Sequence, residues 1–210
     1  TDCEHHDCGT IGQHSHCCPF FCLKLDERGY VTVDGYGRTN LDGVWALGDI
    51  TPGHALAHRA FEQGITIAEK IAGADPKPVL DDTVPQVVFS FPEAASVGLT
   101  LDQAKAREDV VEPKETAYPM LSNARMLMSG EGGSMTVVSG AFANNPDMQV
   151  VLGVHIVSPI ASDLIAEAEQ LVGNRVPLAD AARLIHPHPT FSETLGEALL
   201  KADGRPLHTR

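Results

Sequence analysis

The sequence predicts an α+β fold in which an antiparallel sheet is covered by helices on one side. Strand-like segments, with alternating or β-branched apolar residues, lie at 86–91, 115–118, 134–139 and 150–156. Two amphipathic helical patterns follow them, at 159–172 and 177–185. A run of strands followed by helices predicts an α+β unit.

The part of the chain before this unit has its own pattern, which begins at Lys24. Residues 25–33 predict a turn and a short alternating strand, and residues 43–48 predict a buried strand that ends at Gly48. A helix is expected from about Leu56 to Ala72, because small and apolar residues recur there at helical spacing. The residues expected on its buried face are Ala57, Ala60, Phe61, Gly64, Ile65, Ala68 and Ile71.

A domain boundary is expected within residues 73–84, which are rich in Pro, Asp and Lys and show little periodicity. The two domains then cover residues 24–84 and 85–205. In the second, Thr100 is expected to begin a helix that runs through Ala106, and Asn-Asn-Pro-Asp at 144–147 is expected to form a turn between two strands. Pro177 favours a helix start at its own position.

The first 22 residues contain all five cysteines and four of the ten histidines. Thiolate and imidazole are zinc ligands, so this density permits zinc binding, but the spacings fit no zinc motif. We expect residues 1–23 to be an unassigned segment, disordered or foreign to the rest of the chain. A metal-binding module is the alternative, and no metal ligand is predicted from it.

The formal net charge of −13 restricts the function classes. Binding to nucleic acid or to an anionic membrane surface needs clustered Lys and Arg, so neither partner is expected. No apolar run approaches the ~20 residues that span a bilayer, and no charged-then-apolar leader opens the sequence. A cytoplasmic location is therefore expected.

The run His186-Pro187-His188-Pro189-Thr190-Phe191-Ser192-Glu193 sets an imidazole at a fixed distance from a carboxylate. The two prolines restrict their own φ and favour extended conformations at His186 and His188, so the imidazoles should project from a stiff loop. Glu193 follows His188 by five residues, at the start of the next helical pattern, where its carboxylate can reach an imidazole nitrogen. That is the arrangement of a general base and the group that fixes its tautomer.

The same residues have a purely structural interpretation. Thr190-x-x-Glu193 is also a capping box, in which Thr190 caps a helix and Glu193 bonds back to it without any catalysis. Spacing alone leaves the two interpretations about equal.

Three ordered blocks resemble one known family. The run from His186 to Glu193 resembles the carboxyl-terminal signature of the flavoprotein disulfide reductases, and its doubled histidine resembles the dihydrolipoamide dehydrogenase branch. Thr39-Asn40-Leu41-Asp42-Gly43-Val44-Trp45-Ala46-Leu47-Gly48-Asp49, followed by Leu56-Ala57-His58, resembles the family's second flavin-binding motif. Residues 85–100 resemble the opening of its interface domain. The likeness extends from about Leu25 to the end of the chain.

This resemblance implies the fold and the sites. Residues 24–84 would be the end of the FAD-binding domain, and residues 85–205 the carboxyl-terminal interface domain that forms a homodimer. His188 and Glu193 would form the base that accepts a thiol proton, while Asp49 and Ala57 would contact FAD. The implied reaction is oxidation of dihydrolipoamide on a lipoyl domain of a 2-oxoacid dehydrogenase complex, with NAD as co-substrate. His186, His54 and His58 are expected to be structural.

Other parts of the family pattern are missing from the sequence. The glycine-rich flavin turn, the redox-active cysteine pair and the nicotinamide domain are absent, so the chain resembles the back half of an enzyme and is expected to be inactive by itself. Another flavoprotein disulfide reductase, such as glutathione reductase, is one alternative. A non-catalytic dimerisation module with a Cys/His metal-binding leader is the other.

Overall fold

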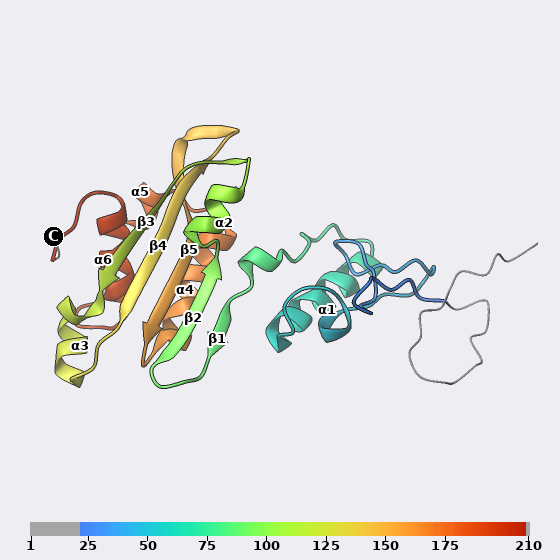
Figure 1. The fold of residues 1–210 in the computed structure, drawn as a ribbon, viewed down its shortest axis with the longest axis horizontal. Helices are drawn as coiled ribbons and strands as arrows, with labels where there is room; N and C mark the ends of the chain where they lie inside the picture. The colour runs from blue at the N-terminus through green and yellow to red at the C-terminus, as the bar shows by residue number, and fades with distance from the viewer. Residues whose placement is uncertain (1–21, 209–210) are drawn as a thin grey trace, which may run out of the picture. The chain divides into compact units, whose positions relative to one another are not determined.

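A computed structural model describes residues 22–208, so the segment 1–21, which holds most of the Cys/His-rich region, lies outside the described residues. The chain divides into two compact units, Thr1–Pro78 and Val79–Arg210. The division falls within the predicted boundary at residues 73–84. Figure 1 shows the sheet of the second unit and the helix labelled α1 in the first.

The second unit is built on a five-stranded sheet with the order β1-β2-β5-β4-β3. Every neighbouring pair is antiparallel. The strands are β1 (Gln86–Val88), β2 (Glu93–Gly98), β3 (Val110–Pro119), β4 (Ser134–Phe142) and β5 (Asn145–Ser158). The predicted antiparallel sheet is therefore confirmed, with strands longer than the patterns suggested at 115–118, 134–139 and 150–156.

Helices cover one face of this sheet and form the main core. They are α4 (Ala161–Gly173), α5 (Leu178–Ala181) and α6 (Glu193–Ala202). The helix α4 packs on β2 and β5, whereas α6 packs on β3 and β4 (Figure 1). Fully buried side chains such as Val137, Val154 and Leu199 fill the space between the layers. This arrangement brings the carboxyl-terminal helix onto the sheet half that holds β3.

A second, smaller cluster lies on the opposite face of the sheet. Val137 and Val138 are neighbours in β4 and point to opposite faces, and Val138 packs with Ala104 of α2 (Leu101–Ala106). The helix α2 begins where the sequence predicted, with a complete capping box between Thr100 and Gln103. Helices thus lie on both faces, although the prediction placed them on one side only.

The short helix α3 (Ala124–Ser129) links β3 to β4 and was not predicted. The Asn123 side chain caps it by accepting from the Met126 N–H at 3.0 Å, and Gly130 ends it in the left-handed conformation. Met126 is fully buried, which fixes the helix against the core. A 3-10 turn, η3 (Met120–Ser122), precedes it.

Within residues 22–78, the first unit contains the helix α1 (Ala57–Ile71) and a 3-10 turn, η1 (Gly48–Ile50). The strands predicted at 25–33 and 43–48 are wrong, because only the isolated bridges Leu25↔Val31 and Arg38↔Trp45 form there. The described part of this unit offers these segments no continuous neighbouring strand to pair with. Asp26 and Asp34 instead bind nearby backbone N–H groups and stabilise turns.

The predicted buried face of α1 is also wrong for the described residues. The helix buries Arg59, Thr66 and Ile67, whereas Phe61 and Ile65 are 71% and 53% exposed. The rest of the described unit packs against the Ile67 side, and it supplies no apolar surface for the side that the spacing selected. None of the helices within residues 22–208 is long and apolar enough to cross a membrane.

Candidate functional site

His188 and Glu193 meet as the sequence predicted. The pair joins the loop after α5 to the first residue of α6, and His188 Nδ1 lies 2.9 Å from Glu193 Oε1. The His188 side chain is 71% exposed, whereas that of Glu193 is only 20% exposed. The imidazole therefore projects from the loop while its partner is held in the protein surface.

Glu193 uses its second oxygen to hold the loop. Its Oε2 accepts from the Thr190 N–H at 2.8 Å, which is one half of the predicted capping box. The other half is absent, because the Thr190 hydroxyl donates to the Pro187 carbonyl at 2.6 Å instead of capping α6. The Asn123 side chain donates to the Thr190 carbonyl at 3.1 Å and ties the loop to the start of α3. The two oxygens of this carboxylate thus have different partners, the His188 ring and the Thr190 N–H.

The charge on Glu193 follows from these contacts. Burial is the largest single influence on the carboxyl and acts to raise its pKa, but the Thr190 N–H and the His188 ring outweigh it, so the pKa of Glu193 is lowered. An ionised carboxylate can only accept hydrogen bonds. His188 must therefore donate through Nδ1–H, and Nε2 is left with the lone pair that a general base needs.

The His186 side chain, unlike that of His188, is buried in the fold. Its Nε2 lies 2.7 Å from Glu167 Oε1 of α4, and its side chain is only 9% exposed. The hydrogen bond that the ring makes to the Glu167 carboxylate is the main influence on it and raises the pKa of His186, although burial opposes this effect. Sequence spacing gave no sign of Glu167, because the two residues lie 19 positions apart on different elements.

The predicted flavin contacts both lie in the first unit, Asp49 in η1 and Ala57 at the start of α1. Both residues are exposed. Gly48 adopts the left-handed conformation at φ +70° and donates its N–H to Gln63 Oε1 of α1 at 2.9 Å, which anchors the turn to the helix. No strand forms over residues 43–48 in the described part of the chain, so the expectation that Asp49 ends one is wrong.

Two residues near the pair were missed by sequence reasoning. The Tyr118 side chain is 1% exposed, and burial raises the pKa of its hydroxyl, with smaller contributions from Glu197 and Glu193. Ser122 donates to that hydroxyl at 3.2 Å. The other is Glu197, one turn after Glu193, which binds His208 Nδ1 at 2.7 Å. An i, i+4 pair of glutamates on one predicted helix is the signal that could have pointed to Glu197.

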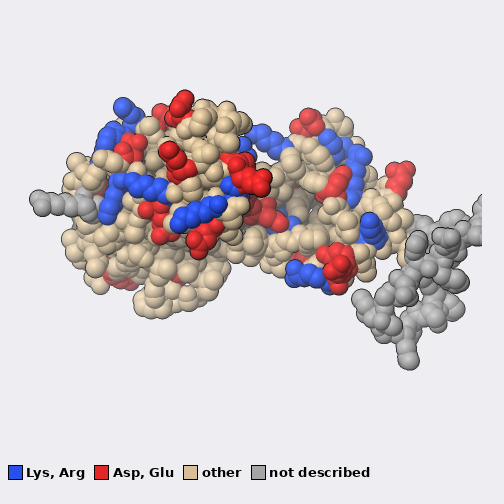
Figure 2. Space-filling view, turned by 45° about the horizontal axis from the view of Figure 1, so that its top comes forward, with Lys and Arg blue, Asp and Glu red and all other residues tan. Residues whose placement is uncertain are grey.

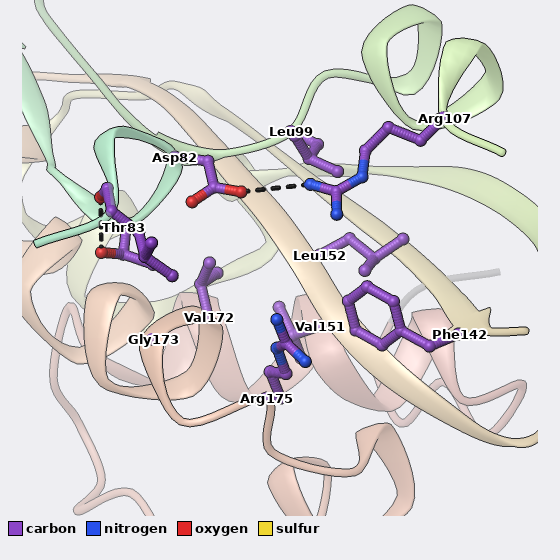
Figure 3. A pocket seen from close by; sticks show the side chains of 11 residues that line it. Asp82, Thr83, Leu99, Arg107, Phe142, Val151, Leu152, Val172, Gly173 and Arg175 are labelled. Atoms are coloured by element: carbon purple, nitrogen blue, oxygen red, sulfur yellow. Dashed lines mark hydrogen bonds and ion pairs between the residues drawn. The ribbon is translucent and has the colours of Figure 1, made fainter. Parts of the chain in front are cut away.

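A pocket in the second unit shares no residue with the His188 pair. Figure 3 shows Arg107 beside Asp82 and Arg175 beside the ring of Phe142, with Leu152 and Val172 among the apolar lining residues. Arg107 binds Asp82 at 3.2 Å and Asp109 at 2.7 Å, so its charge is neutralised within the protein. The ion pair between Arg107 and Asp82 links the loop before β1 to the loop before β3.

Charged side chains do not form a single basic surface on the face drawn in Figure 2. Blue lysine and arginine side chains lie among red acidic ones there, with wide areas of uncharged residues between them. Over the whole sequence, 28 acidic residues outnumber 15 lysines and arginines. A nucleic-acid backbone would find no continuous stripe of cations on that face.

Comparison with known proteins shows which family the chain matches. A model described as the dimerisation domain of pyridine nucleotide-disulphide oxidoreductases matches residues 84–199, and one described as pyridine nucleotide-disulphide oxidoreductase matches residues 21–64. The dihydrolipoyl dehydrogenase of Cupriavidus necator is 40% identical over 188 residues, which are 89% of this chain and 38% of that protein. The Bacillus subtilis dihydrolipoyl dehydrogenase is 38% identical over 185 residues, which are 88% and 38% of the two chains.

Solved structures agree with this placement. LpdA from Mycobacterium tuberculosis superposes with a TM-score of 0.76 at 30% identity, over 86% of this chain and 38% of that one. The flavoprotein disulfide reductase RclA from Escherichia coli shares the fold at 23% identity, with a TM-score of 0.70 over 84% and 40% of the two chains. The chain therefore spans about two fifths of the length of these relatives. Because the dimerisation-domain model matches more than half of its residues, the chain belongs to the pyridine nucleotide-disulphide oxidoreductase family.

Proposed function

We propose that this chain is the carboxyl-terminal portion of a dihydrolipoyl dehydrogenase, in which His188 is the general base. The observation that carries the proposal is the 2.9 Å contact between His188 Nδ1 and Glu193, made by a ring that is 71% exposed. The names of the similar proteins from Cupriavidus necator and Bacillus subtilis support the substrate class.

In this proposal the chain contributes proton transfer. His188 Nε2 takes the proton of a dihydrolipoyl thiol and leaves a thiolate, which is the reactive form of sulfur. The imidazolium that forms is stabilised by the negative carboxylate of Glu193, and the Thr190 N–H keeps that carboxylate in place. The ring then releases the proton to solvent, which regenerates the base.

Asp49 and Ala57 are the residues that we propose to hold FAD. Ala57 is the first residue of α1, the end of a helix that favours an electron-rich ligand, and Asp49 offers an exposed acceptor for a hydroxyl. When bound, the flavin supplies the electron transfer between the dithiol and NAD.

The partners in this proposal are a second copy of the chain and a lipoyl domain of a 2-oxoacid dehydrogenase complex. The dimerisation-domain match supports the homodimer. Val88, Ala94 and Val157 lie in register on the sheet face opposite the main core, and Val88 and Val157 are 61% and 46% exposed. An apolar row of this kind on an open sheet face suits burial against a second copy.

The experiment that tests the proposal compares His188→Gln with His208→Gln in the complete polypeptide. His208 is a matched control, because it is also exposed and also bonded to a glutamate of α6. With reduced lipoamide and NAD+ as substrates, His188→Gln should lower kcat by ~10² to 10⁴-fold, and His208→Gln should leave it nearly unchanged.

Three results would count against this assignment. Equal activity of the two variants would remove His188 from the chemistry. Turnover with glutathione disulfide but none with lipoamide would make the chain part of another disulfide reductase. A complete polypeptide that dimerises but turns over neither substrate would leave it a dimerisation module. We also expect the 210-residue chain by itself to oxidise no reduced lipoamide. Its sequence does not contain the redox-active cysteine pair or the nicotinamide domain of the family.

A further inference from the structure

His186 occupies a junction between three parts of the second unit. Its own backbone lies in the loop that carries His188, two residues before it. Its Nε2 is bonded to Glu167 of α4 at 2.7 Å. Its ring lies on α6 at Gly196, since a Cβ built at that glycine would come within 2.5 Å of His186 Nδ1. The loop is therefore attached to both helices through one buried side chain.

The contact with α6 depends on the absence of a side chain at position 196. Gly196 is buried in the middle of α6, where glycine is less favourable than alanine. Any other residue would push the ring away from the helix. The glycine thus leaves room for the imidazole at a position where helix propensity alone favours alanine.

We infer that His186 is a positioning residue, which joins the loop to α4 and α6 and thereby holds His188 against Glu193. This inference rests on the proposed role of His188 as the base. Without the junction, the four residues from His186 to Pro189 would be held only through Thr190, by its contacts with Glu193, Asn123 and the Pro187 carbonyl.

The charge of the ring supports the same role. Glu167 and the Leu184 backbone both favour the protonated ring, and Glu193 adds a smaller attraction from α6, so the pKa of His186 is raised. The protonated ring carries a positive charge and can donate from both nitrogens. Its positive charge in turn contributes to lowering the pKa of Glu193, which keeps that carboxylate ready to accept from His188.

The experiment uses long-range ¹H–¹⁵N NMR on the histidine rings of the 210-residue chain. The wild-type chain should show His188 mainly as the Nδ1–H tautomer at a pH where His186 is protonated. Glu167→Gln and His186→Gln should both abolish this preference and raise the titration midpoint of the Glu193 carboxyl. Glu169→Gln removes the same charge from α4 two residues further on and should change neither quantity. Glu167→Asp keeps the charge and should restore part of the preference.

Loss of folding in a variant would not leave the inference undecided. The wild-type chain provides a second measurement, because raising the pH through the elevated pKa of His186 removes one of its ring protons. The Nδ1–H preference of His188 should weaken over that same step.

The inference is overturned if Glu167→Gln retains the backbone spectrum of the wild type and also its His188 tautomer and Glu193 midpoint. It is equally overturned if the wild-type tautomer stays constant while His186 loses its proton. Turnover does not enter these measurements. A His188→Gln variant that remains fully active would therefore reject the proposed function and leave the positional role of His186 standing.

Discussion

At the residue scale, Glu193 performs two tasks with one carboxylate. One oxygen accepts from His188 and the other from the Thr190 N–H. The spacing of His188 and Glu193 was sufficient to predict their contact, because a proline-restricted loop and a helix start leave few arrangements for five residues. The partner of His186 could not be predicted in this way. Glu167 reaches it through the packing of α4, which depends on the complete fold.

Glu193→Gln should reverse the tautomer of His188. The amide can still accept from Thr190 with its oxygen, but it then presents an N–H group to His188 Nδ1. That nitrogen must become the acceptor, so the proton moves to Nε2 and the base loses its lone pair. Long-range ¹H–¹⁵N NMR should show the Nε2–H form in this variant. Glu197→Gln, one turn further along α6, should leave the His188 signals unchanged, and a His188 that stays Nδ1–H in Glu193→Gln would contradict the assigned geometry.

At the element scale, patterns predicted the elements of the second unit better than those of the first. Strands β3, β4 and β5 carry apolar side chains at period two and pair with strands of the same unit, so their local pattern matches their surroundings. Strand β2 was missed because Glu93-Ala94-Ala95-Ser96 has little β propensity. The burial of α1 was mispredicted because a helical pattern identifies an apolar face but not what covers it.

The packing of α6 predicts that a substitution that favours the helix by its propensity will nevertheless destabilise the protein. Gly196→Ala should destabilise the second unit by about 1–3 kcal/mol, since the new methyl group would meet the buried His186 ring and outweigh the gain in helix propensity. Gly173→Ala is the matched control at the end of α4, where the nearest atom is the flexible end of Glu169. It should be neutral or slightly stabilising. Urea unfolding followed by circular dichroism measures both, and equal stabilisation by the two variants would exclude a tight contact at position 196.

A hydrogen bond at the start of α4 predicts that the stability of the second unit depends on pH. Glu93 accepts from the Ser162 N–H at 2.8 Å, and this backbone hydrogen bond is the main cause that lowers the pKa of Glu93. A lowered carboxyl pKa gives stability that is complete above the unfolded value of about 4.3 and is lost as the pH falls through the folded value. Glu93→Gln should therefore lower the urea midpoint at pH 7 and have little effect near pH 3. Glu108→Gln, at an exposed position before β3, should show no such difference between the two pH values.

At the scale of the whole molecule, the two units differ in how much apolar surface they bury. In the described part of the first unit the buried apolar side chains are Val31, Ala46 and Ile67. The second unit has a large cluster that joins the sheet to α4, α5 and α6. Stability follows apolar burial, so the units should differ in stability even though they belong to one chain. This difference is consistent with the family comparison, in which the chain corresponds to only about 38% of the length of each relative.

Hydrogen exchange of the 210-residue chain should separate the two units. The amide of Ile67 in α1 is expected to exchange much faster than that of Val154 in β5, because opening the first unit exposes little apolar surface whereas Val154 exchanges only when the main core opens.

Limited proteolysis should cut first within residues 73–84, where Gly73, Ala74 and Asp75 are exposed, and leave a resistant fragment that carries the sheet and α6. The order of cutting and exchange should not change when Phe61→Ser is introduced, because that side chain is already 71% exposed. Equal protection of Ile67 and Val154, or a large loss of protection in Phe61→Ser, would mean that α1 is packed by parts of the chain outside residues 22–208.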